Sequence, residues 1–175
     1  MKDSSDVTGR SQMRTYSTAA IAVVLLFGAG PALSGATCSV AATGVNFGAY
    51  DVSLATPNDS TGDVGVTCTY VPPGGATGVN IRASLSPGVS GSYSPRQMAF
   101  GSGRLNYNLF LDATRTSIWG NGLSGTGIAT ASFTVGPGVG NGTRSALFPV
   151  YGRVPAMQAV AMGGYSDTIV VTVTF

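Results

Sequence analysis

Residues 168–175 read Thr-Ile-Val-Val-Thr-Val-Thr-Phe, and this stretch decides the fold class. Ile169, Val171, Val173 and Phe175 alternate with threonines over most of its length. Successive side chains of a β-strand point to opposite faces of the sheet, so such a segment presents one apolar and one polar face. We therefore predict a half-buried β-strand at the end of the chain.

The same period of two recurs toward the amino terminus. The segments that follow it are residues 64–68, 79–85, 105–111, 129–135 and 146–154. Glycine and proline gather between them, as in residues 86–95 and 136–142, and the polar stretch with Pro57, Asn58, Asp59 and Gly62 is interpreted as a turn region. Short strands separated by such turns predict an all-β sandwich or barrel in one domain.

The composition excludes several classes of function. Charged residues make up 9% of the 175 residues, the formal net charge is +2, and there is no histidine. Without imidazole the chain cannot supply a Ser-His-Asp set or a histidine metal ligand, and we expect no catalytic residues, no metal and no cofactor. The basic residues form no cluster, so we also expect no nucleic-acid partner.

The first 36 residues have the order of an export signal. Lys2, Arg10 and Arg14 precede an apolar run over residues 19–27, and small residues follow up to Ala36. The run is shorter than the roughly 20 residues that span a bilayer, so we favour cleavage over a membrane anchor. We predict a signal peptide over residues 1–36, a domain over residues 37–175, and no stable membrane anchor after cleavage.

Both cysteines lie in the predicted mature chain. Cys38 and Cys68 in an exported protein indicate one structural disulfide. Cys68 falls on the apolar face of its strand, which places the bridge beneath a sheet. A thiol enzyme, a metal site and a lipid anchor on Cys38 are the alternatives, and we favour the bridge over each.

The order of several sequence blocks indicates a family. The blocks are Cys38-Ser39-Val40, residues 45–50, 65–68, 96–98, 105–112 (Leu-Asn-Tyr-Asn-Leu-Phe-Leu-Asp), 118–122, 150–154 and 164–168. Together they resemble the spore coat protein U domain family, which includes the subunits of archaic (Csu-type) chaperone-usher pili. The resemblance covers essentially all of residues 38–175.

This resemblance implies an immunoglobulin-like β-sandwich that lacks one strand. A periplasmic chaperone supplies the missing strand first, and in the fibre the N-terminal extension of another pilus subunit replaces it, with an outer-membrane usher as a further partner. The final strand borders the open groove in such subunits, so Ile169, Val171, Val173 and Phe175 are the candidate groove residues. The alternative is that they are ordinary core residues of a complete sandwich.

One feature departs from the polymerising pattern of this family. A subunit that donates a strand needs about 10 residues ahead of its first cysteine. Cleavage after Ala36 leaves Thr37 alone in front of Cys38. We therefore expect a subunit that accepts a strand and donates none, as at the tip of a fibre.

Other residues allow more specific functional interpretations, which we favour less than structural ones. Asp51, Asp59 and Asp63 offer oxygen ligands for calcium, although turn formation explains them more simply. Asp112 and Asp167 could form a carboxylate pair for glycoside hydrolysis, but nothing in the sequence fixes their separation, and local hydrogen bonds at strand ends are favoured. Trp119 can stack on a sugar, yet burial in the sandwich is the commoner arrangement.

The segment 155–162 is loop-like and almost entirely apolar. Exposed apolar patches mark interaction sites, so Met157, Val160 and Met162 are candidates for an adhesion loop, against the alternative that they cover one end of the core. Our leading hypothesis is a non-enzymatic, exported pilus or cell-surface coat subunit that serves adhesion or biofilm formation and passes through the periplasm. A secreted spore-coat-like protein is the first alternative, and a secreted carbohydrate-binding module or hydrolase the second.

Overall fold

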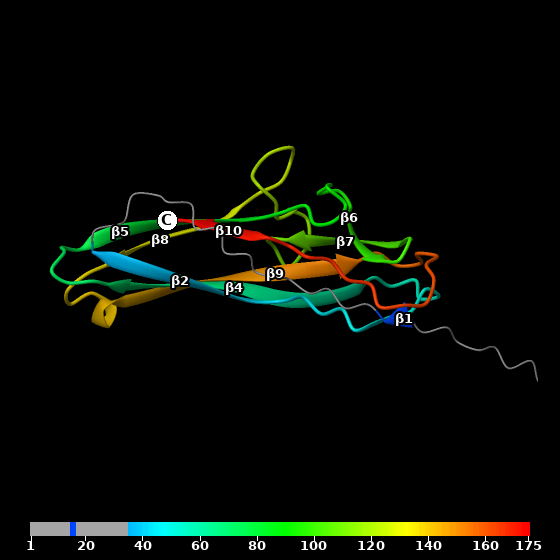
Figure 1. Ribbon diagram of the computed structural model, residues 1–175, viewed down its shortest axis with the longest axis horizontal. Coiled ribbons are helices and arrows are strands. Elements are labelled where there is room, and N and C mark those ends of the chain that lie inside the picture. The colour runs from blue at the N-terminus through cyan, green and yellow to red at the C-terminus, as the bar shows by residue number, and fades with distance from the viewer. Residues whose placement is uncertain (1–14, 17–34) are drawn as a thin grey trace, which may run out of the picture.

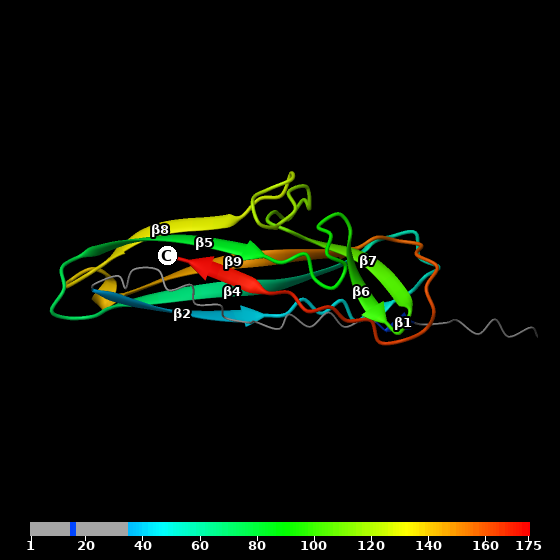
Figure 2. The ribbon, with the colours of Figure 1, turned by 45° about the horizontal axis from the view of Figure 1, so that its top comes forward.

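The computed structural model describes residues 15–16 and 35–175, and it shows two antiparallel sheets packed face to face (Figures 1 and 2). One sheet has the strand order β10-β5-β8, and the other has the order β2-β4-β9-β7-β6. The strands of these two sheets are β2 (Ala36–Thr43), β4 (Asn58–Tyr70), β5 (Thr77–Leu85), β6 (Arg96–Phe100), β7 (Gly103–Phe110), β8 (Ala129–Val135), β9 (Thr143–Val154) and β10 (Val171–Thr174). The predicted all-β sandwich is confirmed.

Three small elements complete the described chain. β1 (Thr15–Tyr16) pairs antiparallel with β3 (Ala49–Tyr50), and a 3₁₀ turn occupies Gly140–Gly142 ahead of β9. β1 lies within the predicted signal peptide, most of which is outside the described residues. The boundary after Ala36 remains a prediction. Residues 15–16 and 35–175 contain no helix with the length and apolar character that a membrane span requires.

The core lies between the sheets. It is formed by alternate residues of the strands, the ones whose side chains point inward. In β5, Val79, Ile81, Ala83 and Leu85 are all buried, whereas the residues between them face outward. Trp119 is fully buried between the two sheets, where its Nε1 donates to the Ala83 carbonyl of β5 and its ring contacts Phe148 of β9. The favoured interpretation of Trp119 as a core residue is therefore confirmed.

The interpretation of the stretch around Asn58 and Asp59 as a turn region is wrong. β4 begins at Asn58, and its first half pairs with the end of β9. Two interactions favour an extended strand here despite the polar sequence. Asp59 faces Arg153 across the ladder and accepts two hydrogen bonds from its guanidinium, and Gly62 packs closely against the Thr43 carbonyl.

Candidate functional site

The final strand, which the family resemblance singles out, lies at a sheet edge. β10 is the edge strand of the three-stranded sheet, and β2 is an edge strand of the five-stranded sheet. Both views place β10 and β2 on the same flank of the sandwich (Figures 1 and 2). On the opposite flank β8, the other edge strand of the three-stranded sheet, lies close to β9. A strand added along β10 on this flank would extend the three-stranded sheet.

The four predicted groove residues share the inner face of the final segment but differ in exposure. Ile169 and Val171 are each 1% exposed, Val173 is half-buried, and Phe175 is 39% exposed. Val171 and Val173 stand opposite Leu85 and Ala83 of β5. Ile169 and Val171 thus complete the core, whereas Val173 and Phe175 offer apolar surface toward the end of the strand.

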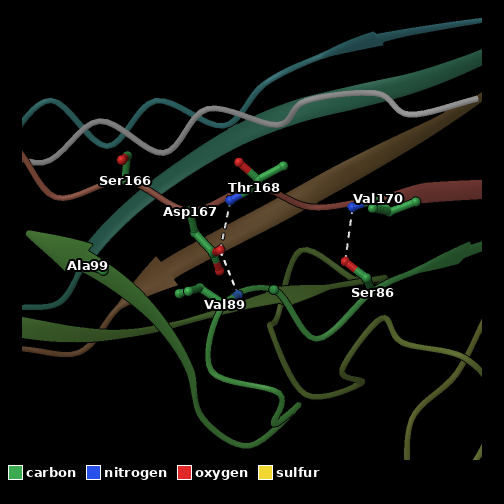
Figure 3. Close-up of a pocket in the computed structure, with 8 residues that line it drawn as sticks. Ser86, Val89, Ala99, Ser166, Asp167, Thr168 and Val170 are labelled. Atoms are coloured by element: carbon green, nitrogen blue, oxygen red, sulfur yellow. Dashed lines mark hydrogen bonds between the residues drawn. The ribbon is translucent and has the colours of Figure 1, made fainter.

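The segment before β10 passes from one sheet to the other. Ser166 exchanges backbone hydrogen bonds with Ala99 of β6, at 2.8 and 3.1 Å, on the edge of the five-stranded sheet. Four residues later the Ser86 amide donates to the Val170 carbonyl, and the Val170 amide donates to the Ser86 Oγ, both at 2.9 Å. Figure 3 shows this second contact. These bonds fix the point where the edge strand begins.

The Asp167 carboxylate holds this crossing in place. Its Oδ1 accepts from the amides of Val89 (2.9 Å) and Thr168 (2.7 Å), as Figure 3 shows, and its Oδ2 accepts from the Tyr107 hydroxyl (2.6 Å). Burial raises the pKa of Tyr107, and donation to Asp167 raises it further. Because both carboxylate oxygens accept bonds from the protein, Asp167 is a structural anchor.

A hollow of about 570 Å³ lies beside this crossing. It is lined by Ser86, Gly88, Val89, Ala99, Ser166, Asp167, Thr168 and Val170. Gly88 has a φ of +75°, and a Cβ there would collide with the Asp167 carboxylate. The loop that follows β5 therefore approaches β10 closely only because residue 88 is glycine.

Sequence reasoning assigned no role to Arg96, which is fully buried. Its guanidinium donates to the Ser86 carbonyl (3.0 and 3.1 Å), the Asn108 Oδ1 (2.7 Å) and the Trp119 carbonyl (2.6 Å), and it lies over the Tyr93 ring. Burial lowers the pKa of Arg96. The position of Arg96 in β6, two residues before the buried Met98, is the sequence signal that it points inward.

The predicted disulfide is present between Cys38 and Cys68. The two residues face each other directly across β2 and β4, with their Cα atoms 4.0 Å apart. Cys68 is fully buried and Cys38 is half-buried, which agrees with a bridge on the inner face of the sheet. The bond therefore ties the edge strand β2 to its neighbour.

The predicted adhesion loop lies at the end of the sandwich. Met157 and Met162 are 68% and 57% exposed, whereas Val160 packs against the core. Gln158 anchors the loop, because its side chain exchanges hydrogen bonds with the Asn106 amide and carbonyl at 2.8 and 2.9 Å. Met157 has a φ of +57°, so this anchored loop holds an exposed methionine in the left-handed region.

Four of the aspartates considered for metal or catalysis have ordinary partners, and these are Asp51, Asp59, Asp112 and Asp167. Asp59 pairs with Arg153 and Arg115, and Asp51 accepts bonds from Ser53. Asp112 accepts from Thr114, Thr116 and Ser117, and these bonds hold the pKa of its carboxyl well below the usual range. Within residues 15–16 and 35–175 there is no group of three potential metal ligands.

Comparison with known proteins assigns the family. Residues 23–172 match the model of the Spore Coat Protein U domain. The chain belongs to this family. It is 34% identical over 154 residues to Protein U of Myxococcus xanthus, a match that covers 81% of this chain and 79% of that protein. The resemblance drawn from the sequence blocks is confirmed.

One solved structure with similarity is a complex of the CsuC chaperone and the CsuE tip adhesion subunit, from archaic chaperone-usher Csu pili of Acinetobacter baumannii. The match has 25% sequence identity and a TM-score of 0.47, and it covers 80% of this chain. The chain spans 40% of the length of the chain it matches there.

Proposed function

We propose that this member of the Spore Coat Protein U domain family is an exported, non-enzymatic subunit of a cell-surface fibre or coat. It assembles by accepting a β-strand from a partner along the edge of β10 that pairs with no strand of residues 15–16 and 35–175. The observation that carries this proposal is the placement of two sheet edges, β10 and β2, on one flank of the sandwich.

The backbone of β10 supports strand acceptance. The Ser86 amide bonds to the Val170 carbonyl, so the antiparallel alternation assigns the amides of Thr172 and Thr174 to β5. We expect the amides of Val171 and Val173 to face the free edge. An unpaired edge of this kind promotes aggregation unless another strand covers it, and an added strand gains affinity from the main chain and specificity from side-chain pockets.

The partners follow from this mode of assembly. A periplasmic chaperone covers the edge during export, an outer-membrane usher directs secretion, and another pilus subunit supplies the final strand. The protein then passes through the periplasm and remains at the cell surface. Family membership and the exposed apolar end of β10 at Val173 and Phe175 support these assignments.

The position of the mature N-terminus decides whether the chain also donates a strand. Cleavage after Ala36 leaves only Thr37 ahead of Cys38, whereas the family match begins at residue 23. We favour the cleaved form, which accepts a strand without donating one. N-terminal sequencing of the exported protein tests this, and a mature chain that begins near residue 23 would restore the donor role.

Co-expression with the cognate chaperone in the periplasm tests strand acceptance. We expect a stable one-to-one complex, and degradation of the chain when the chaperone is absent. Val173→Asp should abolish the complex because it places a charge on the apolar face of β10. Thr172→Asp is the matched control on the outer face, and it should preserve the complex.

Two results would count against strand complementation. A chain that folds as a monomer without the chaperone and resists denaturant would reject strand complementation. Because Val173→Asp can also weaken the fold, the wild-type chain with and without chaperone provides the independent measurement. Equal recovery of wild type in both conditions would overturn the proposal.

We infer that the loop with Met157 and Met162 makes the adhesive contact of this subunit. Its exposed methionines and its anchoring through Gln158 support a preformed apolar surface. Met157→Ser with Met162→Ser should reduce attachment of cells to apolar surfaces without lowering the folded yield. Leu147→Ser, at a residue 67% exposed on another strand, is the control. Unchanged attachment in the double variant would reject the role.

A coat role is the second candidate, and the family description and the Protein U relative favour it. Immunogold labelling of intact cells separates the two. Labelled thin fibres support the pilus subunit, and a continuous labelled layer supports the coat protein.

A further inference from the structure

The outward face of the three-stranded sheet carries an arginine at its centre. Arg82 lies on the middle strand β5, where it stands opposite Thr174 of β10 and Thr130 of β8. Ser84 of β5 and Thr172 of β10 form the next pair whose side chains face outward. Arg82 therefore lies among hydroxyl groups on the outward face of the sheet. A strand added at the edge of β10 would leave this face uncovered.

Arg82 differs in its partners from four other arginines of the described residues, and what separates it from the exposed Arg144 is the hollow that it lines. Arg115 and Arg153 pair with Asp59, Arg96 is buried among carbonyl groups, and Arg104 donates to carbonyls of its own hairpin. Within residues 15–16 and 35–175, no carboxylate pairs with Arg82. Its five N–H donors make no hydrogen bond to a residue of the described ranges and can face a ligand.

A small hollow adjoins this arginine. Its volume is about 100 Å³, and Arg82, Ala83, Ser84, Asn121, Ile128, Thr172 and Thr174 line it. The lining contains hydrogen-bond donors from two strands and from the loop with Asn121, and it contains no acidic side chain. One water molecule accounts for about 30 Å³ in the liquid, so the hollow admits a single carboxylate or sulfate group and excludes a whole sugar ring.

We propose that this hollow binds the anionic group of an acidic polysaccharide, with Arg82 as the charged contact and the hydroxyls of Thr172 and Thr174 as further donors. A guanidinium matches the geometry of carboxylate and sulfate oxygens. A polysaccharide fits better than a nucleic acid because the site has one cation, whereas a phosphate backbone needs several. The choice of a surface polymer rests on the proposed location at the cell surface.

Binding to immobilised polymers tests the site, with the exported chain used in its chaperone complex if that is the form recovered. Alginate presents carboxylates, dextran sulfate presents sulfates, and dextran is the neutral control. We expect binding to one or both acidic polymers and none to dextran. Arg82→Gln should weaken binding about tenfold, as expected for loss of a charge-assisted hydrogen bond. Arg144→Gln removes another exposed arginine and should change binding less than about twofold.

An equal loss of affinity in the two variants would show diffuse charge attraction and would overturn the site. Binding of the chain to neutral dextran, or undiminished binding of Arg82→Gln to the acidic polymers, would also overturn it. Thermal unfolding of each variant checks that the fold is intact, which we expect because the Arg82 side chain points outward. Failure of the proposed assembly would appear as recovery of wild type without chaperone, and that result is independent of polymer binding.

Discussion

At the scale of single residues, Gly88 and Asp167 set the position of the strand-accepting edge. Asp167 accepts hydrogen bonds from Val89, Thr168 and Tyr107, and Gly88 leaves the room that this arrangement needs. The first bond ties the loop after β5 to the segment before β10. A change at Gly88 should therefore affect β10 although residue 88 is not part of it.

Gly88→Ala should lower the free energy of unfolding by about 2–4 kcal/mol, since it combines a positive φ with a collision against a buried carboxylate. Gly91→Ala is the matched control in the same loop, because Gly91 has a φ of +67° and no atom within 4 Å of an added Cβ. It should lose about 1–2 kcal/mol from the backbone alone. Urea unfolding of the chain in its chaperone complex, the form used for every urea measurement below, measures both, and equal losses would show that the contact with Asp167 is unimportant.

Asp59 gives the fold a pH dependence in acid. The hydrogen bond from Arg153 holds the pKa of the Asp59 carboxyl below its usual value. Its stabilising effect is therefore complete above the unfolded pKa near 3.9 and is lost as the pH falls through the folded pKa. The Asp59 side chain is 33% exposed, so the effect at neutral pH is below about 1 kcal/mol.

Asp59→Asn should therefore destabilise the protein at pH ~7, and this loss should shrink as the pH is lowered toward ~2 through the folded pKa of Asp59. Asp63→Asn is the control on the same strand, since no arginine of the described residues forms an ion pair with Asp63. Urea unfolding across this range of pH measures the difference. A loss for Asp59→Asn that is the same at both ends of the range would contradict the ion-pair account.

At the scale of elements, the sequence predicted the strands whose inner and outer faces alternate cleanly. β8 occupies the predicted residues 129–135, and β5 extends the predicted residues 79–85 by two residues. β6 was not predicted, because the buried guanidinium of Arg96 occupies an inward position that the pattern expects to be apolar. Its acceptors come from the loop after β5, β7 and Trp119, and no local pattern shows that they converge.

The disulfide between Cys38 and Cys68 joins two elements, the edge strand β2 and its neighbour β4. It closes a loop with a sequence separation of 30, for which the chain-entropy model gives about 3–4 kcal/mol. Replacing both Cys38 and Cys68 by alanine should lower the free energy of unfolding by about this amount, measured by urea unfolding. A loss below about 1 kcal/mol would mean that the strand pairing alone holds β2 in place.

At the scale of the whole molecule, the sequence predicted the fold class, the disulfide and the family, because each depends on a repeated pattern or on a pair of residues. The candidate site was predicted less fully. Ile169 and Val171 prove to be core residues, and the crossing at residues 166–170 depends on contacts with the distant Ser86, Ala99 and Tyr107. Such contacts arise from the packing of two sheets and leave no local signal.

The central claim is that β10 accepts a strand from a partner. Hydrogen exchange of the β10 amides, compared between the purified chain refolded in vitro without chaperone and its chaperone complex, tests this claim most directly. We predict that the amides of Val171 and Val173 become strongly protected in the complex, whereas the Thr172 amide, already bonded to β5, changes little. Unchanged exchange at Val171 and Val173 on complex formation would contradict the account.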